Sequence, residues 1–230
     1  MGRGQNRDKS TLILLRHGAS IWNDKNLFTG WVDIPLSPKG IQESLSAGEV
    51  ISKIPIDVIF TSTLIRAQMT AMLAMADHPK VPFILHPGEG NLEEWATIHS
   101  EETRKEMVPV RCAWQLNERM YGELQGMNKD EMRQKFGADE VHKWRRSFDG
   151  VPPGGESLKM TSGRTIPYFK EEIFPFLEEG KNVFISAHGN SLRSIVMMLD
   201  QLSESQVVAL EIPTGIPWIY KFENGAWKRQ

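Results

Sequence analysis

Features that are scarce in this chain exclude several classes of protein. Cys112 is the single cysteine among 230 residues, so no intramolecular disulfide can form and a reducing compartment is favoured. No apolar run approaches the ~20 residues that a membrane-spanning helix needs, and residues 1–7 lack the apolar core of a signal peptide. The formal net charge of -2 lacks the basic excess typical of nucleic-acid binding. We therefore expect a cytoplasmic protein that binds neither membranes nor nucleic acid.

Apolar and amphipathic segments alternate along the chain in the order typical of an α/β protein. Short apolar runs over residues 11–15, 56–61, 81–85, 182–187 and 216–222 predict strands, and the segments between them predict helices. This alternation predicts a three-layer α/β/α fold with a mostly parallel central sheet flanked by helices. The length fits a single domain over residues 1–230.

Local signals refine some of these elements. Ser37 followed by Pro38 is a typical helix start and predicts a helix that continues to Ile51. A long helix over residues 156–179 should be interrupted at Pro167 and Pro175. Residues 87–110 have a weaker pattern and predict a partly helical excursion from the core. The helix expected over residues 64–76 has an apolar side that we expect to face the core, made of Met69, Met72, Leu73 and Ala76.

Two of the predicted strands end at a histidine. The first strand runs into Arg16-His17-Gly18, and the strand over residues 182–187 runs into His188-Gly189-Asn190. Parallel strands present their carboxyl ends at one edge of the sheet, where α/β proteins bind ligands. The strand that ends near residue 61 leads into a helix with Arg66 in its first turn. We therefore expect two histidines, two arginines and a helix N-terminus in one crevice.

This set of side chains suits a phosphoryl group. Guanidinium groups bind phosphate oxygens in pairs, and a neutral imidazole can attack phosphorus. The leaving oxygen then needs a proton, for which Glu118 is the candidate general acid and base; a surface carboxylate paired with Arg119 is the alternative. A zinc site is disfavoured, because no HExxH motif or cysteine ligand accompanies the histidines and the arginines beside them would repel a cation. We expect no metal.

Dense motifs over residues 11–222 resemble those of the cofactor-dependent phosphoglycerate mutases, a family within the histidine phosphatase superfamily. The Phe-Thr-Gly-Trp and Trp-Arg-Arg sequences are typical of the mutase branch, whereas the superfamily as a whole shares only the arginine and the two histidines. The motifs that carry the resemblance are residues 16–23, 26–31, 61–67, 116–122 and 124–129, Trp144-Arg145-Arg146, Glu156-Ser157-Leu158, residues 187–193 and Ile212-Pro213-Thr214-Gly215.

The resemblance implies interconversion of 3-phosphoglycerate and 2-phosphoglycerate, with 2,3-bisphosphoglycerate as the cofactor that first phosphorylates His17. It implies that Glu118 moves the hydroxyl proton, and that the transferring phosphoryl group is held by Arg16, Arg66, His188 and the Gly189 N–H. The small phosphoglycerate would otherwise be gripped by Ser20, Asn23, Thr29, Gly30, Arg119, Tyr121, Lys129, Arg145, Arg146 and Asn190. The family includes monomers, dimers and tetramers, so a homo-oligomer is compatible with it.

This chain also departs from the family pattern. Ala19 stands where the family usually has Glu or Gln, and Met120 stands where His is common. Residues 79–112 are longer than in the best-known members and predict an insertion, and residues 1–9 predict a flexible N-terminus. The stretch between Arg146 and Glu156 is short, and the usual tail is missing after Phe222.

Two alternatives to a mutase therefore remain. Loops and tails close such sites, and in this chain they are shortened. A phosphohistidine-type phosphatase, with water as the acceptor of the phosphoryl group, is therefore one alternative. A phosphate-ester-binding module without catalysis is the other. Such a module should lack part of the catalytic set, whereas this chain has all five of its residues: Arg16, His17, Arg66, Glu118 and His188. Without the resemblance, Trp144-Arg145-Arg146 is typical of a solvated helix face with one buried indole.

Overall fold

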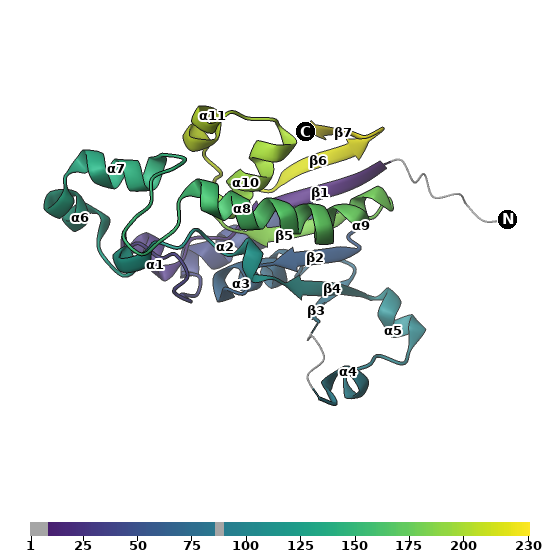
Figure 1. The fold of residues 1–230 in the computed structure, drawn as a ribbon. Helices are drawn as coiled ribbons and strands as arrows, with labels where there is room; N and C mark the ends of the chain where they lie inside the picture. The colour runs from purple at the N-terminus through teal and green to yellow at the C-terminus, as the bar shows by residue number, and fades with distance from the viewer. Residues whose placement is uncertain (1–8, 86–89) are drawn as a thin grey trace.

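The computed structural model describes residues 9–85 and 90–230, and a seven-stranded sheet forms their centre (Figure 1). Its strands lie in the order β3-β4-β2-β5-β1-β6-β7. The first five in this order pair in parallel, whereas β6 and β7 are antiparallel. The mostly parallel sheet of an α/β fold is therefore confirmed. The strands are β1 (Lys9–Arg16), β2 (Val58–Thr61), β3 (Val81–Ile84), β4 (Met107–Cys112), β5 (Val183–Ala187), β6 (Trp218–Glu223) and β7 (Ala226–Arg229).

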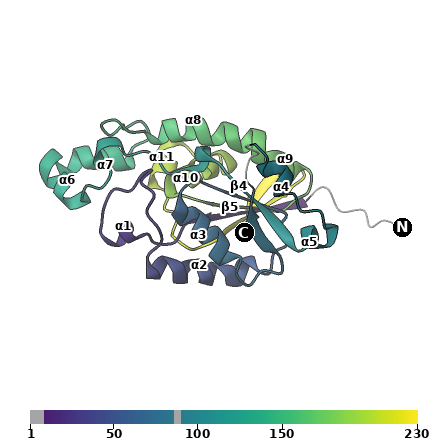
Figure 2. The ribbon, with the colours of Figure 1, turned by 90° about the horizontal axis from the view of Figure 1, so that it is seen from below.

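Helices cover both faces of the sheet, as Figure 2 shows. On one side lie α2 (Pro38–Ile51) and α3 (Ile65–Ala74), and on the other lie α8 (Leu158–Tyr168), α9 (Phe174–Glu178) and α10 (Gly189–Leu199). Alternate residues of β1 supply the two cores: Leu12 and Leu14 pack with the α8–α10 side, while Ile13 and Leu15 pack with the α2–α3 side. This alternation follows from the two-residue period of a strand, and it explains why β1 is apolar throughout.

The packing of α2 against α3 corrects the expected core face of α3. The residues of α3 that are buried are Arg66, Ala67, Thr70, Ala71 and Ala74. Met72 packs against this core, but Met69 and Leu73 are only partly buried and Ala76 is exposed, so the predicted core face was wrong except at Met72. A Cβ on Gly48 of α2 would lie 3.0 Å from the Ala74 carbonyl oxygen. Because the helices approach so closely, only small side chains fit between them, and the longer ones lie at the flanks.

The long helix is interrupted near both predicted prolines. Pro167 lies inside α8, which continues to Tyr168, and a π-helical turn, η3 (Phe169–Ile173), follows it. Pro175 lies in the first turn of α9, where a proline is tolerated. Other local signals are confirmed: the Ser37 hydroxyl accepts from the Gly40 N–H at the start of α2.

The remaining helices are mostly short. They are α1 (Ile21–Asp24), α4 (Leu92–Trp95), α5 (Glu101–Lys105), α6 (Lys129–Phe136), α7 (Ala138–Arg146) and α11 (Glu204–Ala209), with 3₁₀ turns η1 (Trp114–Leu116) and η2 (Gly122–Leu124). In Figure 1, α1, α6 and α7 lie beyond the carboxyl ends of the parallel strands. A separate apolar cluster joins α6 and α7 to the loop after α1, and it is made of Phe28, Leu124, Met132, Val141 and Trp144. No helix of the described residues is both long and apolar enough to span a membrane.

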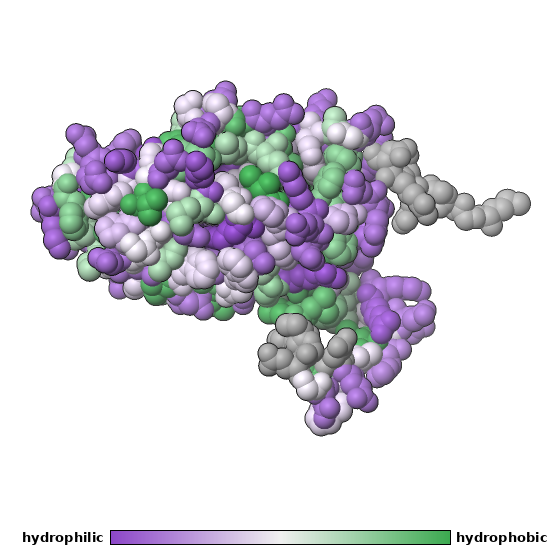
Figure 3. Space-filling view, viewed as in Figure 1, coloured by the Kyte–Doolittle hydropathy of each residue, from purple (hydrophilic) through white to green (hydrophobic). Residues whose placement is uncertain are grey.

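The segment between β3 and β4 carries α4 and α5 away from the sheet. Figure 3 shows it projecting from the body, with apolar residues gathered where the two meet. The ends of the predicted insertion, residues 79–112, form β3 and β4 of the central sheet. That it is an insertion relative to other family members stays a prediction. Residues 86–89 of this segment, and residues 1–8 of the predicted N-terminal extension, lie outside the described residues, and Lys9 already belongs to β1.

Candidate active site

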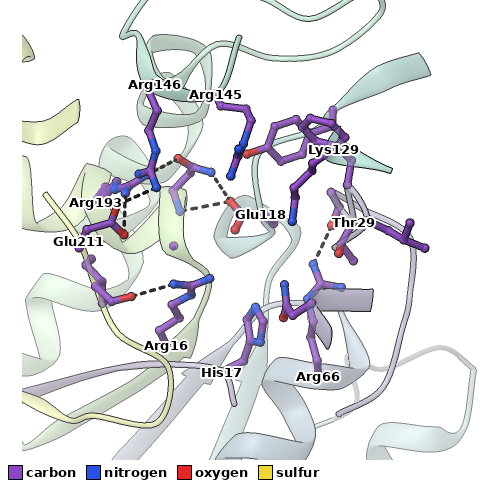
Figure 4. Close-up of a pocket in the computed structure, with 18 residues that line it drawn as sticks. Arg16, His17, Thr29, Arg66, Glu118, Lys129, Arg145, Arg146, Arg193 and Glu211 are labelled. Carbon is purple, nitrogen blue, oxygen red and sulfur yellow. Dashed lines mark hydrogen bonds and ion pairs between the residues drawn. The ribbon is translucent and has the colours of Figure 1, made fainter. Parts of the chain in front are cut away.

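The carboxyl ends of β1 and β5 bring the two histidines together. The strands are parallel neighbours, with Arg16 opposite Ala187. The His17 N–H donates to the Ala187 carbonyl oxygen at 2.9 Å. His188 follows β5 directly, and its ring centroid lies 4.9 Å from that of His17. The expected juxtaposition is therefore present, and a pocket opens above His17 (Figure 4).

His17 is held as a neutral base. Its Nδ1 lies 2.7 Å from the Gly18 carbonyl oxygen, and because a carbonyl can only accept, Nδ1 carries the proton and Nε2 keeps its lone pair. Burial, aided by the positive charges of Arg66 and Arg16, lowers the pKa of His17 well below its ordinary value of 6.5. The imidazole is therefore uncharged at neutral pH and available as a nucleophile.

Cations outnumber carboxylates around the pocket. Six basic side chains line it, against two carboxylates, Glu118 and Glu211; the basic ones are Arg16, Arg66, Lys129, Arg145, Arg146 and Arg193. Burial, together with Arg145, Arg16 and Arg133, lowers the pKa of Lys129 to about 8. Positive charges that repel one another in a half-buried pocket are stabilised when an anion binds among them. The pocket is therefore suited to a ligand with several negative charges.

Backbone carbonyls fix the two arginines predicted to hold a phosphoryl group. Arg66 is buried, and it donates to the Val32 carbonyl oxygen at 2.9 Å and to that of Gly30 at 2.7 Å. Arg16 donates through Nη1 to the Ile212 carbonyl oxygen at 2.9 Å. Each guanidinium keeps further N–H groups after these bonds. The arginines are therefore held in place with donors still available to a ligand.

Ser62 holds the ring of His188 by a hydrogen bond. The Ser62 hydroxyl lies 2.7 Å from His188 Nε2, and it also accepts from the Leu64 N–H at 3.1 Å. The other ring nitrogen of His188, Nδ1, is buried and has no hydrogen-bond partner among the described residues. Ser62 occurs in one of the motifs, but the sequence predicted no role for it.

Glu118 presents one free oxygen to the pocket. Its Oε1 accepts from the Arg119 N–H at 2.7 Å, from the Asn190 N–H at 3.2 Å and from the Asn190 side-chain amide at 2.8 Å. Oε2 makes no hydrogen bond within residues 9–85 and 90–230, and a Cβ on Gly189 would lie 3.7 Å from it. Glu118 thus lies beside the N-terminus of α10, and Oε2 can give or take a proton.

Most of the buried polar atoms without partners belong to predicted site residues. Seven such side-chain atoms occur among the described residues, and five belong to predicted site residues: Arg16 Nε, Thr29 Oγ1, Arg119 Nε and Nη1, and His188 Nδ1. Buried polar atoms are normally hydrogen-bonded, and Arg16 and Thr29 line the pocket, so their unpartnered atoms are available to a ligand there.

Most of the predicted binding residues line the pocket, but three of the predicted site residues do not. His188 lies behind His17, and Ser20 caps α1 through its hydroxyl. Arg119 is buried with its guanidinium carbon 4.8 Å from the Tyr121 ring centroid, and it donates to the Tyr121 hydroxyl and to the Arg145 carbonyl oxygen. The residues that line the pocket are Asn23, Thr29, Gly30, Tyr121, Lys129, Arg145, Arg146, Gly189 and Asn190, with Arg16, His17, Arg66 and Glu118.

The pocket also contains residues that the sequence did not predict. Arg193 donates to the Asn190 side-chain oxygen at 3.2 Å, one helical turn away on α10. Glu211 pairs with Arg146 at 2.6 Å and with Arg193 at 3.6 Å. Arg193 could have been found from its i,i+3 spacing to Asn190, whereas no local signal marks Glu211. No group of three or more His, Cys, Asp or Glu able to hold a metal ion occurs in the described part of the chain.

The chain matches known proteins along almost its whole length. The family model of the histidine phosphatase superfamily (branch 1) matches residues 12–115 and 96–230. The 2,3-bisphosphoglycerate-dependent phosphoglycerate mutase of Protochlamydia amoebophila is 64% identical over 221 residues, which are 95% of this chain and 98% of that protein. The protein of the same name from Chlamydia muridarum is 57% identical over 213 residues, 92% of this chain and 93% of that one.

Solved structures share the fold. The phosphoglycerate mutase from Bacillus anthracis has a TM-score of 0.69 at 20% identity, covering 98% of this chain and 94% of that one. The alpha-ribazole phosphatase from Shigella flexneri has a TM-score of 0.74 at 19% identity, covering 96% and 94%. These identities are low, so this likeness concerns the fold alone. With the family model matching nearly every residue from Leu12 onward, this chain belongs to the histidine phosphatase superfamily (branch 1).

Proposed function

We propose that this chain is an isomerase that interconverts 3-phosphoglycerate and 2-phosphoglycerate through a phosphohistidine at His17, with 2,3-bisphosphoglycerate as primer. The observation that carries the proposal is the neutral His17, whose Nε2 lone pair faces a pocket lined by six cations. The names of relatives that are 64% and 57% identical support the choice of substrate. We expect the enzyme in the cytoplasm, on the grounds of its single cysteine.

The residues present fit a bisphosphorylated ligand. When bound, 2,3-bisphosphoglycerate would supply the phosphoryl group that His17 accepts. Arg16, Arg66, His188 and the Gly189 N–H would hold the transferring group, because the two arginines carry fixed positive charge and Arg16 Nε and His188 Nδ1 have no hydrogen-bond partner among the described residues. The carboxylate and the second phosphate would be held by other residues that line the pocket, which are Asn23, Thr29, Lys129, Arg145 and Arg146.

In the chemical step a bond forms between His17 Nε2 and phosphorus while the bond between phosphorus and the ester oxygen breaks. Phosphoryl transfer needs in-line positioning of the reacting atoms and neutralisation of the phosphate charge. The arginines neutralise that charge without giving up a proton. A protonated Glu118 gives its proton to the departing oxygen through Oε2. In the return step the same carboxylate takes the proton of the accepting hydroxyl, so Glu118 alternates between acid and base.

An enolase-coupled assay on 3-phosphoglycerate tests the proposal. We expect turnover that requires 2,3-bisphosphoglycerate in catalytic amount, with little release of inorganic phosphate. Release of phosphate as the main product would make the chain a phosphatase, with water as acceptor in place of the substrate hydroxyl. Turnover at full rate after the bisphosphate has been removed enzymatically would contradict the role of the primer.

A further inference from the structure

We infer that Arg164, with Glu156 as its counter-ion, is a positioning residue that holds the Glu118 loop in the geometry needed for proton transfer. This inference rests on the proposed function. Arg164 lies on α8, 46 positions from Glu118. The motif Glu156-Ser157-Leu158 contributes to the family resemblance, but neither it nor Arg164 had been given a role.

The Arg164 guanidinium uses all five of its N–H groups within the protein. Nε and Nη2 donate to the two carboxylate oxygens of Glu156 at 3.0 and 2.9 Å. Nη1 donates to the carbonyl oxygens of Gln115 and Asn117 at 2.8 and 3.0 Å, and Nη2 donates to that of Glu118 at 2.9 Å. Nη1 also donates to the Trp114 carbonyl oxygen at 3.5 Å. No N–H group is left for a ligand, so Arg164 acts on the reaction only through its neighbours.

Glu156 grips the other side of the same loop. Its Oε2 accepts from the Met120 N–H at 3.0 Å, while its own N–H donates to the Met120 carbonyl oxygen at 2.8 Å. Burial alone would raise the pKa of Glu156, but the hydrogen bonds from Arg164 and Met120 outweigh it and lower that pKa. The carboxylate therefore stays charged, and the pair fixes the backbone on both sides of Glu118.

An aromatic side chain, Trp31, also holds the Glu118 loop. The Trp31 Nε1–H donates to the Glu118 carbonyl oxygen at 2.6 Å, and the Arg164 guanidinium carbon lies 5.5 Å from the Trp31 ring centroid. The side chain of Arg164 is 8% exposed, so these bonds are shielded from water. A displacement of 1 Å in a catalytic group can cost about a hundredfold in rate. The bonds from Arg164, Glu156 and Trp31 to this loop should therefore affect the rate of transfer.

The leaving-group dependence of single-turnover phosphoryl transfer to His17 tests this inference. Arg164→Met keeps an apolar stem and removes the donors. Proton donation contributes about 100-fold or more, so we expect a loss of that size with 2,3-bisphosphoglycerate as donor. With p-nitrophenyl phosphate, whose leaving group departs as a stable anion, the loss should be under about threefold. Arg229→Met, which removes an arginine at the far sheet edge, should change neither rate.

A double-mutant cycle gives the second readout. In a Glu118→Gln background, adding Arg164→Met should cost less than about threefold, because a residue that acts through Glu118 has nothing left to position. Equal losses with both donors, or losses that multiply in the double variant, would overturn the inference. Where Arg164→Met does not fold, Arg164→Lys keeps the buried charge and should show the same donor dependence. Failure of the wild-type chain to accept phosphate from the bisphosphate would instead refute the proposed function.

Discussion

The contact between the loop after β1 and the first turn of α2 yields a quantitative prediction. A Cβ on Gly18 would lie 2.2 Å from the Gly40 carbonyl oxygen, and a Cβ on Gly40 would lie 1.9 Å from that of Ala19. Both partners are backbone atoms, so neither can rotate away. Gly18→Ala must therefore push the β1 loop and α2 apart by roughly 1 Å, an overpacking that costs about 3 kcal/mol. For a domain of this size, that lowers Tm by about 6–12 °C.

The same substitution should impair transfer to His17. Gly18 follows His17, and its carbonyl oxygen holds His17 Nδ1. A shift of that carbonyl turns the imidazole away from its in-line position, so we expect single-turnover transfer from 2,3-bisphosphoglycerate to slow by about 100-fold. Thermal unfolding followed by circular dichroism gives the stability, and rapid quenching gives the rate.

Two matched glycine variants act as controls. Gly40→Ala meets the same contact from α2 and should lose similar stability, but it lies one element away from His17 and should lose less rate. Gly163 lies inside α8, and a Cβ there would meet nothing within 4 Å. Gly163→Ala should therefore gain about 0.5–1 kcal/mol from the lower entropy of the unfolded chain. A Gly18→Ala variant with the Tm and rate of the wild type would refute this reasoning.

Three further predictions follow from the charges of the site. Glu118→Gln should slow phosphoryl transfer by about 10²–10⁴-fold with little change in ligand affinity, and wild-type rates in that variant would exclude an acid–base role. Burial and the neighbouring arginines hold the pKa of His17 and of His188 well below 6.5. The unfolded chain therefore binds more protons below that pH, and the free energy of unfolding should fall as the pH drops through and below 6.5. Urea titrations should show a shallower fall in His188→Gln, and an unchanged slope would contradict the buried neutral state. Because the pKa of Lys129 is about 8, KM for 3-phosphoglycerate should rise above that pH as the ammonium is lost; Lys129→Arg, which keeps its charge, should abolish this rise.

Regular strand ends made part of the site predictable from sequence alone. A parallel pair aligns its carboxyl ends, so two apolar runs that each end at a histidine were enough to bring His17 and His188 together. Glu118 lies on a loop without a repeating pattern. Its placement depends on bonds to Arg164 and Asn190, which are distant in sequence. The residues alone therefore named Glu118 as a candidate but left a surface carboxylate as the alternative, and the family resemblance favoured the acid–base role.

The errors in the fold have local and tertiary causes. The strand β7 was missed although Asn224-Gly225, both at positive φ, is a strong signal for a tight hairpin. The core face of α3 was misjudged because the prediction favoured the large apolar side chains, whereas the space against α2 admits only small ones. The close approach of Gly48 to Ala74 involves two helices, so the sequence of one helix does not reveal it. The π-helical turn that separates α8 from α9 was not predicted, because a proline marks an interruption but not the geometry that follows it.

Transfer of a labelled phosphoryl group to the protein tests the central claim most directly. The chain is mixed with radiolabelled 2,3-bisphosphoglycerate, quenched in alkali and digested, and the labelled peptide is sequenced. We predict one acid-labile, alkali-stable phosphohistidine at position 17, formed fast enough to support turnover and absent in His17→Ala. Label on another residue, or mutase turnover that survives in His17→Ala, would contradict the account.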